Sequence, residues 1–388
     1  MRIFFFTHPS FLGSQSMPRF ANMLADGMQK RGHAVKVLMP EARFFKLPVP
    51  QSLKKWMGYI DQYILFPMLV RKLKKESGKE TLFVFTDHAL GPWIPLVADR
   101  PHVIHCHDFL AQRSALNEIP ENPTSASGKK YQAYIRRGYQ RGKNFISVSQ
   151  KTQYDLHRFL KAAPQISDMV YNGLNPSFVL QDVNTAREVI GKHINVDLSK
   201  GYILHVGGNQ WYKNRMGVIE IYDAWCKKYG GGIPLLMFGP EANVKLATKR
   251  EASPYKNDIY LLSGKDDAFV KQAYTGASLF LFPSLAEGFG WPIAEAMASG
   301  APVITTGEAP MNEVGGNAAF YISRRPSANV GDWDNESAKV LDKVLNLDVE
   351  SRKEIIDAGL ENVNRFNLQT AIQQIEAIYQ KIVDGCTK

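Results

Sequence analysis

Two glutamates flank a glycine-interrupted loop in the stretch 282–300, and these residues give the clearest sign of chemistry in the chain. The loop carries Glu287 and Gly290, follows the apolar run 279–282, and enters a predicted helix that contains Pro292 and Glu295. Glycines let the backbone approach a ligand, and the free N–H groups of a helix N-terminus attract phosphate. The two carboxylates are acceptors suited to hydroxyl groups. A phosphate cradle with two hydroxyl-binding acids describes a nucleotide sugar, whereas an ordinary strand-to-helix connection would leave Gly-Phe-Gly-Trp-Pro at 288–292 unexplained.

Two successive series of alternating strands and helices are expected to position this loop. In the first half a helix at 18–31 separates the first two of five apolar strands, at 3–6, 34–39, 82–86, 103–107 and 145–148. The second half repeats the pattern, with a helix at 216–225 and strands at 202–206, 234–238, 259–262, 279–282 and 303–305. Such alternation predicts an α/β fold of two Rossmann-like, doubly wound parallel-sheet domains facing a central cleft, with ligands at the carboxyl ends of the strands.

The 388 residues are too many for one ordinary core, so two domains are the natural division. The expected boundaries are 1–178 for an acceptor-binding domain and 179–368 for a nucleotide-sugar-binding domain. A final helix at 369–388 could return to the first domain. The join is placed near 175–182, where Asn-Pro-Ser marks a loop.

Positive charge is concentrated in the first half of the chain. Residues 1–180 carry 25 Lys and Arg against 12 Asp and Glu, and residues 181–388 carry 22 against 25. The first half therefore suits an anionic partner, namely a phosphorylated acceptor or an acidic membrane surface, unless the charge is simply solvated. The basic residues follow no nucleic-acid-binding motif, so no nucleic-acid partner is expected.

One segment, 53–75, interleaves aromatic and apolar residues with lysines and an arginine. Such a helix could lie on an anionic membrane or hold a lipid-linked acceptor, which leaves peripheral membrane contact open. The alternative is a core helix with a solvated lysine-rich end. Pro67 is expected to kink or divide the helix.

The cysteines and the apolar runs indicate a cytoplasmic protein, with a peripheral position at the inner membrane face left open. Cys106, Cys226 and Cys386 are odd in number and widely spaced, which argues against a disulfide framework or a zinc cluster. No apolar run approaches the ~18 residues that a membrane span needs. The apolar N-terminus meets His8 and Pro9 too early for a signal peptide.

With these residues in view, the chain resembles the family 4 glycosyltransferases, which are retaining, largely metal-independent enzymes with the GT-B fold, and the bacterial polysaccharide-biosynthesis type in particular. The resemblance rests first on the spacing of Glu287 and Glu295, with Glu-Gly-Phe-Gly at 287–290 and Gly-Ala-Pro-Val-Ile at 300–304. Weaker matches extend it over most of the chain: the loop around Gly13, Ser14, Gln15 and Ser16, the segments 31–35, 146–149, 171–174 and 205–208, and the pairs His107-Asp108 and Lys213-Asn214.

The resemblance implies a catalytic set of His107, Lys213 and Glu287. Glu287 would contact hydroxyls of the donor sugar, Lys213 would neutralise the diphosphate leaving group, and His107 would help to position the reacting carbon. The rest of the implied set binds the donor: Glu295 would hold the ribose, and the other members are Gly13, Gly208, Asn209, Phe289, Gly290 and Trp291, mainly through their backbones. No metal site is implied.

One departure from the family pattern concerns the diphosphate. Many relatives carry an arginine shortly before the lysine that Lys213 matches, whereas this chain has Asn-Gln-Trp-Tyr at 209–212. Either Arg215 replaces it, or Asn209 and backbone amides suffice, or the leaving group is stabilised less. Arg215 lies two positions along a predicted helix and is expected to point elsewhere.

The expected reaction is transfer of a hexose from a nucleotide-diphosphate sugar to a saccharide or lipid-linked saccharide, with retention. The donor is a co-substrate, with UDP-glucose favoured, and no further cofactor is expected. Three alternatives are considered: a nucleotide-sugar epimerase, a binding module without catalysis, and a nicotinamide-dependent dehydrogenase. The last needs G-x-G-x-x-G after a strand, and residues 7–16 offer only Gly13.

Overall fold

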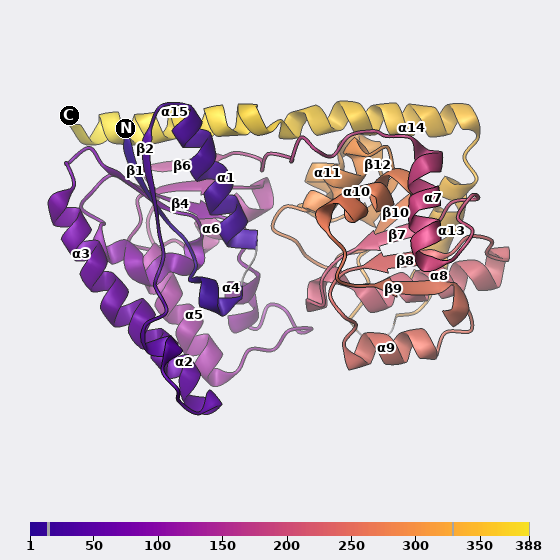
Figure 1. Ribbon diagram of the computed structural model, residues 1–388, viewed down its shortest axis with the longest axis horizontal. Coiled ribbons are helices and arrows are strands. Elements are labelled where there is room, and N and C mark those ends of the chain that lie inside the picture. Colours follow the sequence, from indigo (N-terminus) through magenta and orange to yellow (C-terminus); the bar gives the residue numbers. More distant parts are fainter. Residues whose placement is uncertain (14–15, 328–329, 388) are drawn as a thin grey trace. The chain divides into compact units, whose positions relative to one another are not determined.

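The computed structural model describes residues 1–13, 16–327 and 330–387, and the chain divides into two compact units (Figure 1). Unit 1 contains residues 1–119, 123–171 and the segment from Gln369 onward, and unit 2 contains 120–122 and 172–368. The chain passes into unit 2 after Tyr171, earlier than the expected loop at 175–182. The reason is that the Leu174 N–H donates to the Phe366 carbonyl at 2.7 Å, which ties this segment to unit 2.

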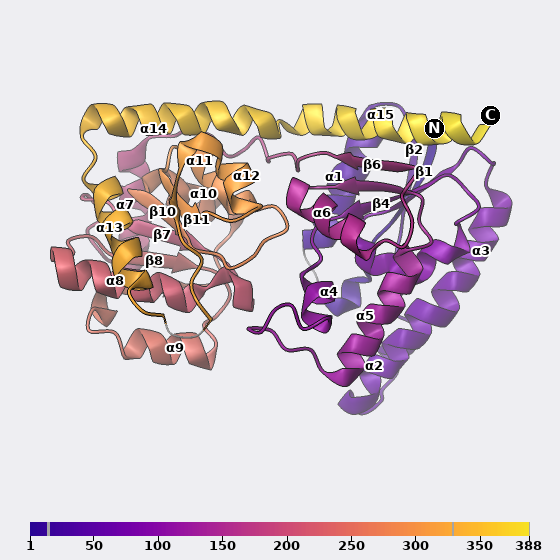
Figure 2. The same ribbon diagram turned by 180° about the vertical axis from the view of Figure 1, so that it is seen from behind.

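Unit 1 is built on a six-stranded parallel sheet in the order β2-β1-β3-β4-β5-β6. The strands are β1 (Arg2–Phe6), β2 (Ala34–Leu38), β3 (Leu82–Phe85), β4 (His102–Cys106), β5 (Asn144–Ser147) and β6 (Ile166–Met169). The helices are α1 (Ser16–Lys30), α2 (Gln51–Ile60), α3 (Phe66–Glu76), α4 (Leu110–Ala115), α5 (Ala126–Tyr139), α6 (Gln150–Phe159) and α15 (Leu368–Thr387). Helices α3 and α5 pack on one face of the sheet, and α1 and α15 pack on the other (Figures 1 and 2).

Pro67 does not divide the helix between 51 and 76. A π turn at Asp61–Leu65 joins α2 to α3 without a break, and Pro67 lies in the first turn of α3. Proline is tolerated in a first turn, and the wider hydrogen bonding of a π turn accommodates it in a continuing helix.

Unit 2 repeats the architecture with the strand order β12-β11-β10-β7-β8-β9, again all parallel (Figure 1). The strands are β7 (Ile203–Val206), β8 (Leu235–Phe238), β9 (Ile259–Leu262), β10 (Leu279–Phe282), β11 (Val303–Thr306) and β12 (Ala319–Ile322). The helices are α7 (Val183–Ile194), α8 (Arg215–Tyr229), α9 (Val244–Glu251), α10 (Asp267–Gly276), α11 (Trp291–Ala298), α12 (Met311–Gly315), α13 (Trp333–Leu345) and α14 (Val349–Asn362). Helices α8, α9 and α13 share one core with the sheet.

Helix α15 packs together with α1 on the second face of the unit 1 sheet. The Tyr379 hydroxyl lies 2.7 Å from His105 Nε2 on β4, and Glu376 forms ion pairs with Arg31 at 2.5 Å and His33 at 2.6 Å. Burial lowers the pKa of His105 to about 3, so its ring is neutral and Tyr379 is its polar partner. The last helix is therefore part of the unit 1 core.

Each sheet has a topological switch point, where the strand order reverses and later strands are added at the opposite edge of the first strand. Open α/β sheets bind ligands at such points. In unit 2 the switch lies between β7 and β10, and in unit 1 it lies between β1 and β3. The loops that follow these four strands are therefore the places to look for a site.

Candidate functional site

Lys213 and Glu287 meet at the switch point of unit 2. Lys213 follows β7 and Glu287 follows β10, and Lys213 Nζ lies 2.8 Å from Glu287 Oε1. Both side chains are mostly buried, with 14% and 9% of their surfaces exposed. The hydroxyl of Ser284 donates to the same Glu287 oxygen at 2.8 Å. The sequence-predicted diphosphate cation and sugar-binding acid thus form one charged, hydrogen-bonded group.

Backbone and side-chain hydrogen bonds lock the two loops that carry this pair. The Leu285 N–H donates to the Tyr212 carbonyl at 2.7 Å, and Asn214 Nδ2 donates to the Pro283 carbonyl at 2.9 Å. Asn214 itself adopts a left-handed backbone, with φ of 51°. Because asparagine tolerates this conformation better than most residues, the chain can turn sharply from Lys213 into helix α8.

Gly290 provides the backbone turn that opens helix α11. Its φ of 107° and ψ of 46° lie in a region that side chains rarely adopt, and it is the residue immediately before the helix. Phe289 is buried against Phe366 and Trp291, whose ring is half-buried at the first helical position. The N–H groups of the first turn therefore start beside Glu287, at the carboxyl end of β10.

Glu295 lies one turn into α11, and the hydroxyl of Tyr274 donates to its Oε2 at 3.0 Å. Burial raises the pKa of Glu295 to about 7, although the Tyr274 hydrogen bond and the charge of Lys213 act in the opposite direction. A carboxyl group with a pKa near 7 is only partly ionised at neutral pH. A ligand that donates hydrogen bonds to the carboxylate stabilises the ionised form. Ribose hydroxyls are donors of this kind.

Asn209 and Arg215 fasten the loop after β7 to the loop after β8. Asn209 Nδ2 donates to the Glu241 carbonyl at 2.7 Å, and its Oδ1 accepts from Arg215 Nη1 at 2.6 Å. Both polar atoms of the Asn209 side chain are therefore engaged within the protein, and its expected contact with the donor stays a prediction. Gly208 precedes Asn209 in the same loop.

The expectation that Arg215 points elsewhere than the diphosphate stays a prediction, but the structure places its side chain at the loops that follow β7 and β8. Its guanidinium is buried beside Asn209 and Gly239, because α8 begins at Arg215 itself and directs the side chain back under the strand ends. Burial lowers the pKa of Arg215 to about 10, and no carboxylate pairs with it among the described residues. A cation held in this way adds to the positive field at the carboxyl ends of β7 and β8.

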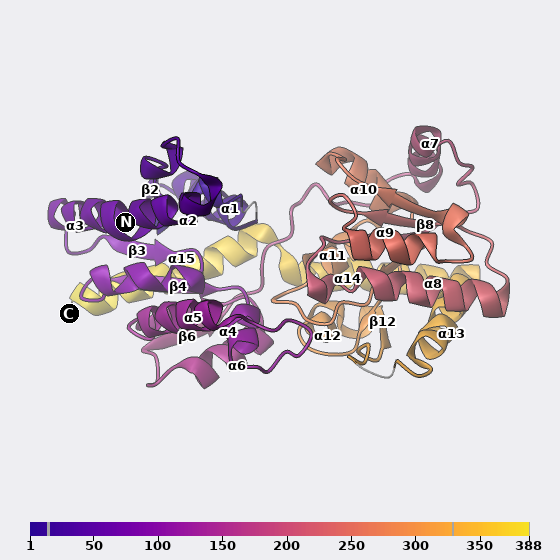
Figure 3. The ribbon, with the colours of Figure 1, turned by 90° about the horizontal axis from the view of Figure 1, so that it is seen from below.

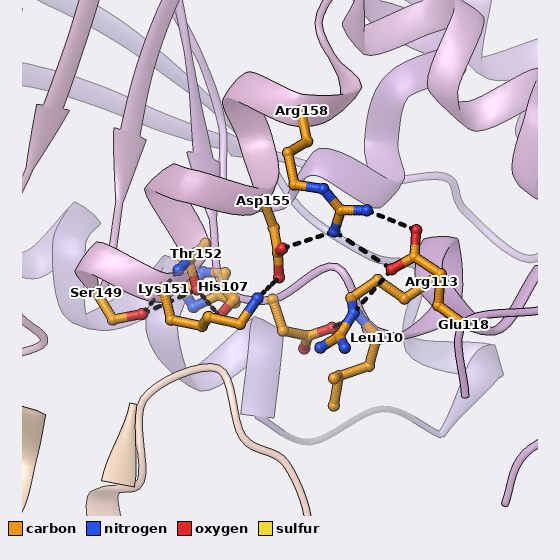
Figure 4. Close-up of polar contacts among 10 residues, drawn as sticks. His107, Leu110, Arg113, Glu118, Ser149, Lys151, Thr152, Asp155 and Arg158 are labelled. Atoms are coloured by element: carbon orange, nitrogen blue, oxygen red, sulfur yellow. Dashed lines mark hydrogen bonds and ion pairs between the residues drawn. The ribbon is translucent and has the colours of Figure 1, made fainter. Parts of the chain in front are cut away.

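His107 lies in unit 1, directly after β4 (Figure 4). Its Nε2 donates to the Thr86 carbonyl at 3.0 Å, its own carbonyl accepts from Thr152 Oγ1 at 3.1 Å, and its ring packs on Phe20. Burial lowers the pKa of His107, so the ring is neutral. The neighbouring Asp108 accepts from the Leu110 N–H at 2.9 Å and so caps the start of α4.

The lysine, arginine, aspartate and glutamate side chains labelled in Figure 4 form an ionic chain in unit 1. Lys151 pairs with Asp155 at 2.6 Å, and Arg158 joins Asp155 to Glu118 at 3.2 and 2.7 Å. Arg113 pairs with Glu118 at 3.2 Å. These contacts tie α6 to the segment after α4, next to the loop that carries His107.

Gly13 is open to its surroundings. It ends a short 3-10 turn, Ser10–Leu12, with φ of 72°, and a side-chain carbon built there would meet nothing within 4 Å. There is open space beside its backbone, but its N–H already donates to the Ser10 carbonyl at 3.1 Å. Ser14 and Gln15, which belong to the same expected loop, lie outside the described residues.

The sequence reasoning missed a pair at the switch point of unit 1. His8 follows β1 and Asp87 follows β3, and His8 Nε2 lies 2.9 Å from Asp87 Oδ2. Burial would raise the pKa of Asp87, but His88 and His8 outweigh it and hold the pKa well below its usual value. The strand endings Thr-His and Thr-Asp-His were the available signal, which becomes informative only once β1 and β3 are known to be neighbours.

The sequence contains one Asp-x-Asp pattern, a common metal-binding motif, but its described surroundings do not form a metal site. The pattern occurs at 332–334, at the start of α13, and Asp334 accepts from the adjacent Asn335 N–H. Among the described residues no group of three or more His, Cys, Asp or Glu is arranged to hold a metal ion.

The chain matches two known glycosyltransferase families. The sequence pattern of the group 1 glycosyl transferases matches residues 187–361, and that of glycosyltransferase family 4 matches residues 17–178. The chain is a family 4 glycosyltransferase. The two matches follow the two units closely, and the family 4 signature at 287–295 falls in the group 1 match.

Two curated relatives of this glycosyltransferase are named O-antigen chain mannosyltransferases. It is 29% identical over 184 residues to the O-antigen chain mannosyltransferase B of Escherichia coli, which is 47% of this chain and 46% of that protein. It is 22% identical over 300 residues to the O-antigen chain mannosyltransferase RfbU of Salmonella typhimurium, covering 77% and 75%. The first match thus spans about half the length of its relative.

Solved structures show that the glycosyltransferase has the GT-B fold. HepE from Anabaena, solved with UDP and glucose, superposes with a TM-score of 0.71 at 18% identity, covering 97% of this chain and 98% of that one. WaaG, described as a glycosyltransferase of lipopolysaccharide biosynthesis, gives 0.69 at 15%, with 97% and 98% covered. At these identities the likeness concerns the fold.

Proposed function

We propose that this glycosyltransferase transfers a hexose from a nucleotide-diphosphate sugar to a saccharide or lipid-linked saccharide during bacterial polysaccharide synthesis. The observation that carries the proposal is the group at the unit 2 switch point. There the Lys213–Glu287 pair, the Gly290 turn and the start of α11 lie at the carboxyl ends of adjacent strands. This is where doubly wound sheets bind nucleotides.

In this proposal the diphosphate lies between Lys213 and the N–H groups that follow Gly290. Glu287 accepts from hydroxyls of the sugar, and Glu295 accepts from those of the ribose. Arg215 contributes charge through the loop that it fastens rather than by direct contact, since Asn209 and the Pro240 carbonyl occupy its Nη1 group. Phe289 and Trp291 shape the apolar wall. UDP-glucose is the favoured donor, and GDP-mannose is the first competitor because two of the relatives are named mannosyltransferases.

The proposed mechanism is a same-face substitution that retains the anomeric configuration. The bond from the anomeric carbon to the diphosphate oxygen breaks through an oxocarbenium-like transition state. The acceptor oxygen then bonds to the same face, and the departing phosphate takes its proton. Lys213 and the α11 N–H groups stabilise the charge on the leaving oxygen. A covalent glycosyl-enzyme trapped by mass spectrometry would contradict this mechanism.

The acceptor side is proposed to lie at the unit 1 switch point, near Gly13, His107 and the His8–Asp87 pair. We also propose a cytoplasmic location with peripheral contact at the inner membrane face, because a lipid-linked acceptor would be presented there. Across the described ranges, no helix is both long and apolar enough to cross a bilayer.

Thermal-shift screening with UDP-, GDP- and ADP-sugars tests the donor assignment. A cognate donor at one hundred times its Kd should add ~2.7 kcal/mol to the free energy of unfolding. Glu295→Ala should weaken binding of the free nucleotide, whereas Glu287→Ala should mainly remove the extra affinity that the sugar contributes. No stabilisation by any activated sugar would refute the proposal, and turnover of UDP-sugar without an acceptor would favour an epimerase instead.

A further inference from the structure

The continuous helix of residues 51–76 exposes a stripe of large apolar side chains. Leu53, Trp56, Ile64 and Met68 follow one another at intervals of three, eight and four residues, and they are 44%, 61%, 55% and 60% exposed. Multiples of three and four place residues on the same face of a helix. A π turn, such as the one at 61–65, rotates the chain about the helix axis by a smaller angle per residue than an α turn does. This smaller rotation keeps Trp56 and Ile64 on the same face of the helix.

The opposite side of this helix is packed against unit 1, so the stripe is a true outer face. Gly58 lies against the rings of Phe11 and Phe45, and Phe66 packs on Phe6 and Trp93. Along one flank, the Tyr63 hydroxyl bonds to that of Tyr131 on α5 at 2.7 Å. Figure 3 shows α2 and α3 along the outer side of unit 1.

The same face becomes basic toward its C-terminal end. Lys72 and Lys75 follow Met68 at intervals of four and three residues, and both are exposed. Lys72 has Glu76 as a distant partner, at 3.9 Å. An amphipathic helix with apolar side chains followed by lysines is typical of a segment that lies in the plane of a membrane interface.

A basic cavity opens beside this end of the helix. It has a volume of about 1360 Å³ and lies at the amino ends of β4 and β5, opposite the strand ends that carry His107. Arg71, Lys75, Lys79 and Lys143 line it without an ion pair in the described part of the chain, while its Asp99 is paired with Lys74 at 2.5 Å. The cavity thus carries uncompensated positive charge, which suits a phosphate oxyanion.

We infer that the stripe and the cavity together form a docking surface for an anionic lipid bilayer. The apolar side chains enter the interfacial layer, and the cavity receives the phosphate of a lipid headgroup. The inference deepens the proposed peripheral location and uses no residue of the donor site. A second copy of the chain fits less well, because a self-complementary contact through this surface would place the same excess of lysine and arginine on both sides of the interface.

Vesicle co-sedimentation of the full chain tests the inference. The protein should bind vesicles of phosphatidylcholine mixed with phosphatidylglycerol and not vesicles of phosphatidylcholine alone, and added salt should weaken binding. Replacing the apolar stripe by Trp56→Ser, Ile64→Ser and Met68→Ser should reduce partition about tenfold, because apolar burial sets interfacial affinity. Replacing the cavity cations by Arg71→Gln, Lys75→Gln, Lys79→Gln and Lys143→Gln should remove the preference for the anionic lipid.

Matched variants on unit 2 provide the controls. Three exposed valines can be changed together, Val189→Ser, Val244→Ser and Val349→Ser, as can four exposed lysines, Lys227→Gln, Lys228→Gln, Lys245→Gln and Lys353→Gln. Both control proteins should bind vesicles like the unchanged protein. Equal losses in controls and test variants, or equal binding to both kinds of vesicle, would overturn the inference.

Two further measurements distinguish lipid docking from binding of a soluble phosphate and from dimer formation. Inorganic phosphate that stabilises the protein through the cavity cations, without any vesicle binding, would point to a soluble phosphate ligand and refute lipid docking. A dimer that the apolar triple substitution dissociates, again without vesicle binding, would refute it as well. Binding of UDP-, GDP- and ADP-sugars is measured in parallel: failure of all of them to bind, with vesicle binding intact, would refute the proposed function and leave this inference standing.

Discussion

Lys213 and Glu287 are each other's counter-ions, with Nζ and Oε1 2.8 Å apart and both side chains mostly buried. The pair joins loops that are 74 residues apart in sequence, so it fixes the loop after β10 to the loop after β7. In the proposed donor complex, a diphosphate that approaches Lys213 would share this cation with Glu287, and Glu287 would then be available to sugar hydroxyls. The proposal therefore links stabilisation of the leaving group to the positioning of the sugar.

This coupling predicts the behaviour of variants at the two positions. Lys213→Met should lower the free energy of unfolding by about 2 kcal/mol, because it leaves Glu287 largely buried without its cation. The double variant Lys213→Met, Glu287→Gln should recover most of that loss, while UDP-glucose binding stays impaired in both. Denaturant unfolding and calorimetric titration provide the two readouts. Unchanged stability in the single variant would show that the pair is not energetically coupled.

The pH dependence of donor binding should follow Glu295. Its pKa is raised to about 7, and ribose hydroxyls would donate to the ionised form, so affinity should rise with pH through neutrality. Between pH 6 and pH 8 the Kd for UDP-glucose should fall by up to about tenfold, as expected for a ligand that selects the ionised state. UDP-glucose is preferred to UDP because its diphosphate does not titrate in this range. Glu295→Gln should bind weakly and without pH dependence; a pH-dependent Gln variant would assign the titration to another group.

Ionisation of Glu295 should also lower the free energy of unfolding at alkaline pH. Because its folded-state pKa lies above the ordinary value of 4.5, the protonated carboxyl favours the fold, and this contribution is full below pH 4.5 and lost as pH rises through about 7. At pH 8, Glu295→Gln should be more stable than the unchanged protein by about 2 kcal/mol. The difference should shrink toward pH 5. Urea unfolding at both pH values measures it, and a constant difference would contradict the assignment.

Much of the fold was readable because parallel strands covered on both faces are continuous apolar runs. Leu-Phe-Leu-Phe at 279–282 is such a run, and it is β10. Two of the four edge strands, β2 and β9, were predicted, and the other two were not: β6, Ile166–Met169, is Ile-Ser-Asp-Met and only partly buried, and β12, Ala319–Ile322, is also mostly half-buried. An edge strand needs little apolar sequence, so periodicity does not always single it out.

In the candidate site, some features depend on local sequence and others depend on contacts between residues far apart in the chain. The turn at Gly290 and the helix that follows are local, and their residue types predicted them. The contacts of Lys213 with Glu287, and of His8 with Asp87, depend on which strands are neighbours. Strand order is a property of the assembled sheet, so these pairings emerge only from the structure. The roles assigned to the individual residues stay predictions.

Metal independence is open to a direct test. If Lys213 and the N–H groups at the start of α11 stabilise the diphosphate, no divalent cation is needed for that task. Sugar transfer, measured with a donor identified by thermal shift, should therefore survive EDTA. Loss of activity that added Mg²⁺ or Mn²⁺ restores would show that a cation shares the leaving group with Lys213.

Gly290 offers the sharpest test of the turn that opens α11. At its φ of 107° an alanine would be strained by about 1–2 kcal/mol, and its Cβ would lie 3.3 Å from Ile293 Cδ1. Gly264, in the loop after β9, is the matched control: it also has a positive φ, of 66°, and a Cβ there would meet nothing within 4 Å. Both alanine variants should lose stability, but only Gly290→Ala should also lose UDP-glucose affinity, by about tenfold or more, since each N–H directed at the diphosphate is a charge-assisted donor. Equal losses of affinity in the two variants would mean that strain alone, and not the direction of the α11 amides, accounts for the effect.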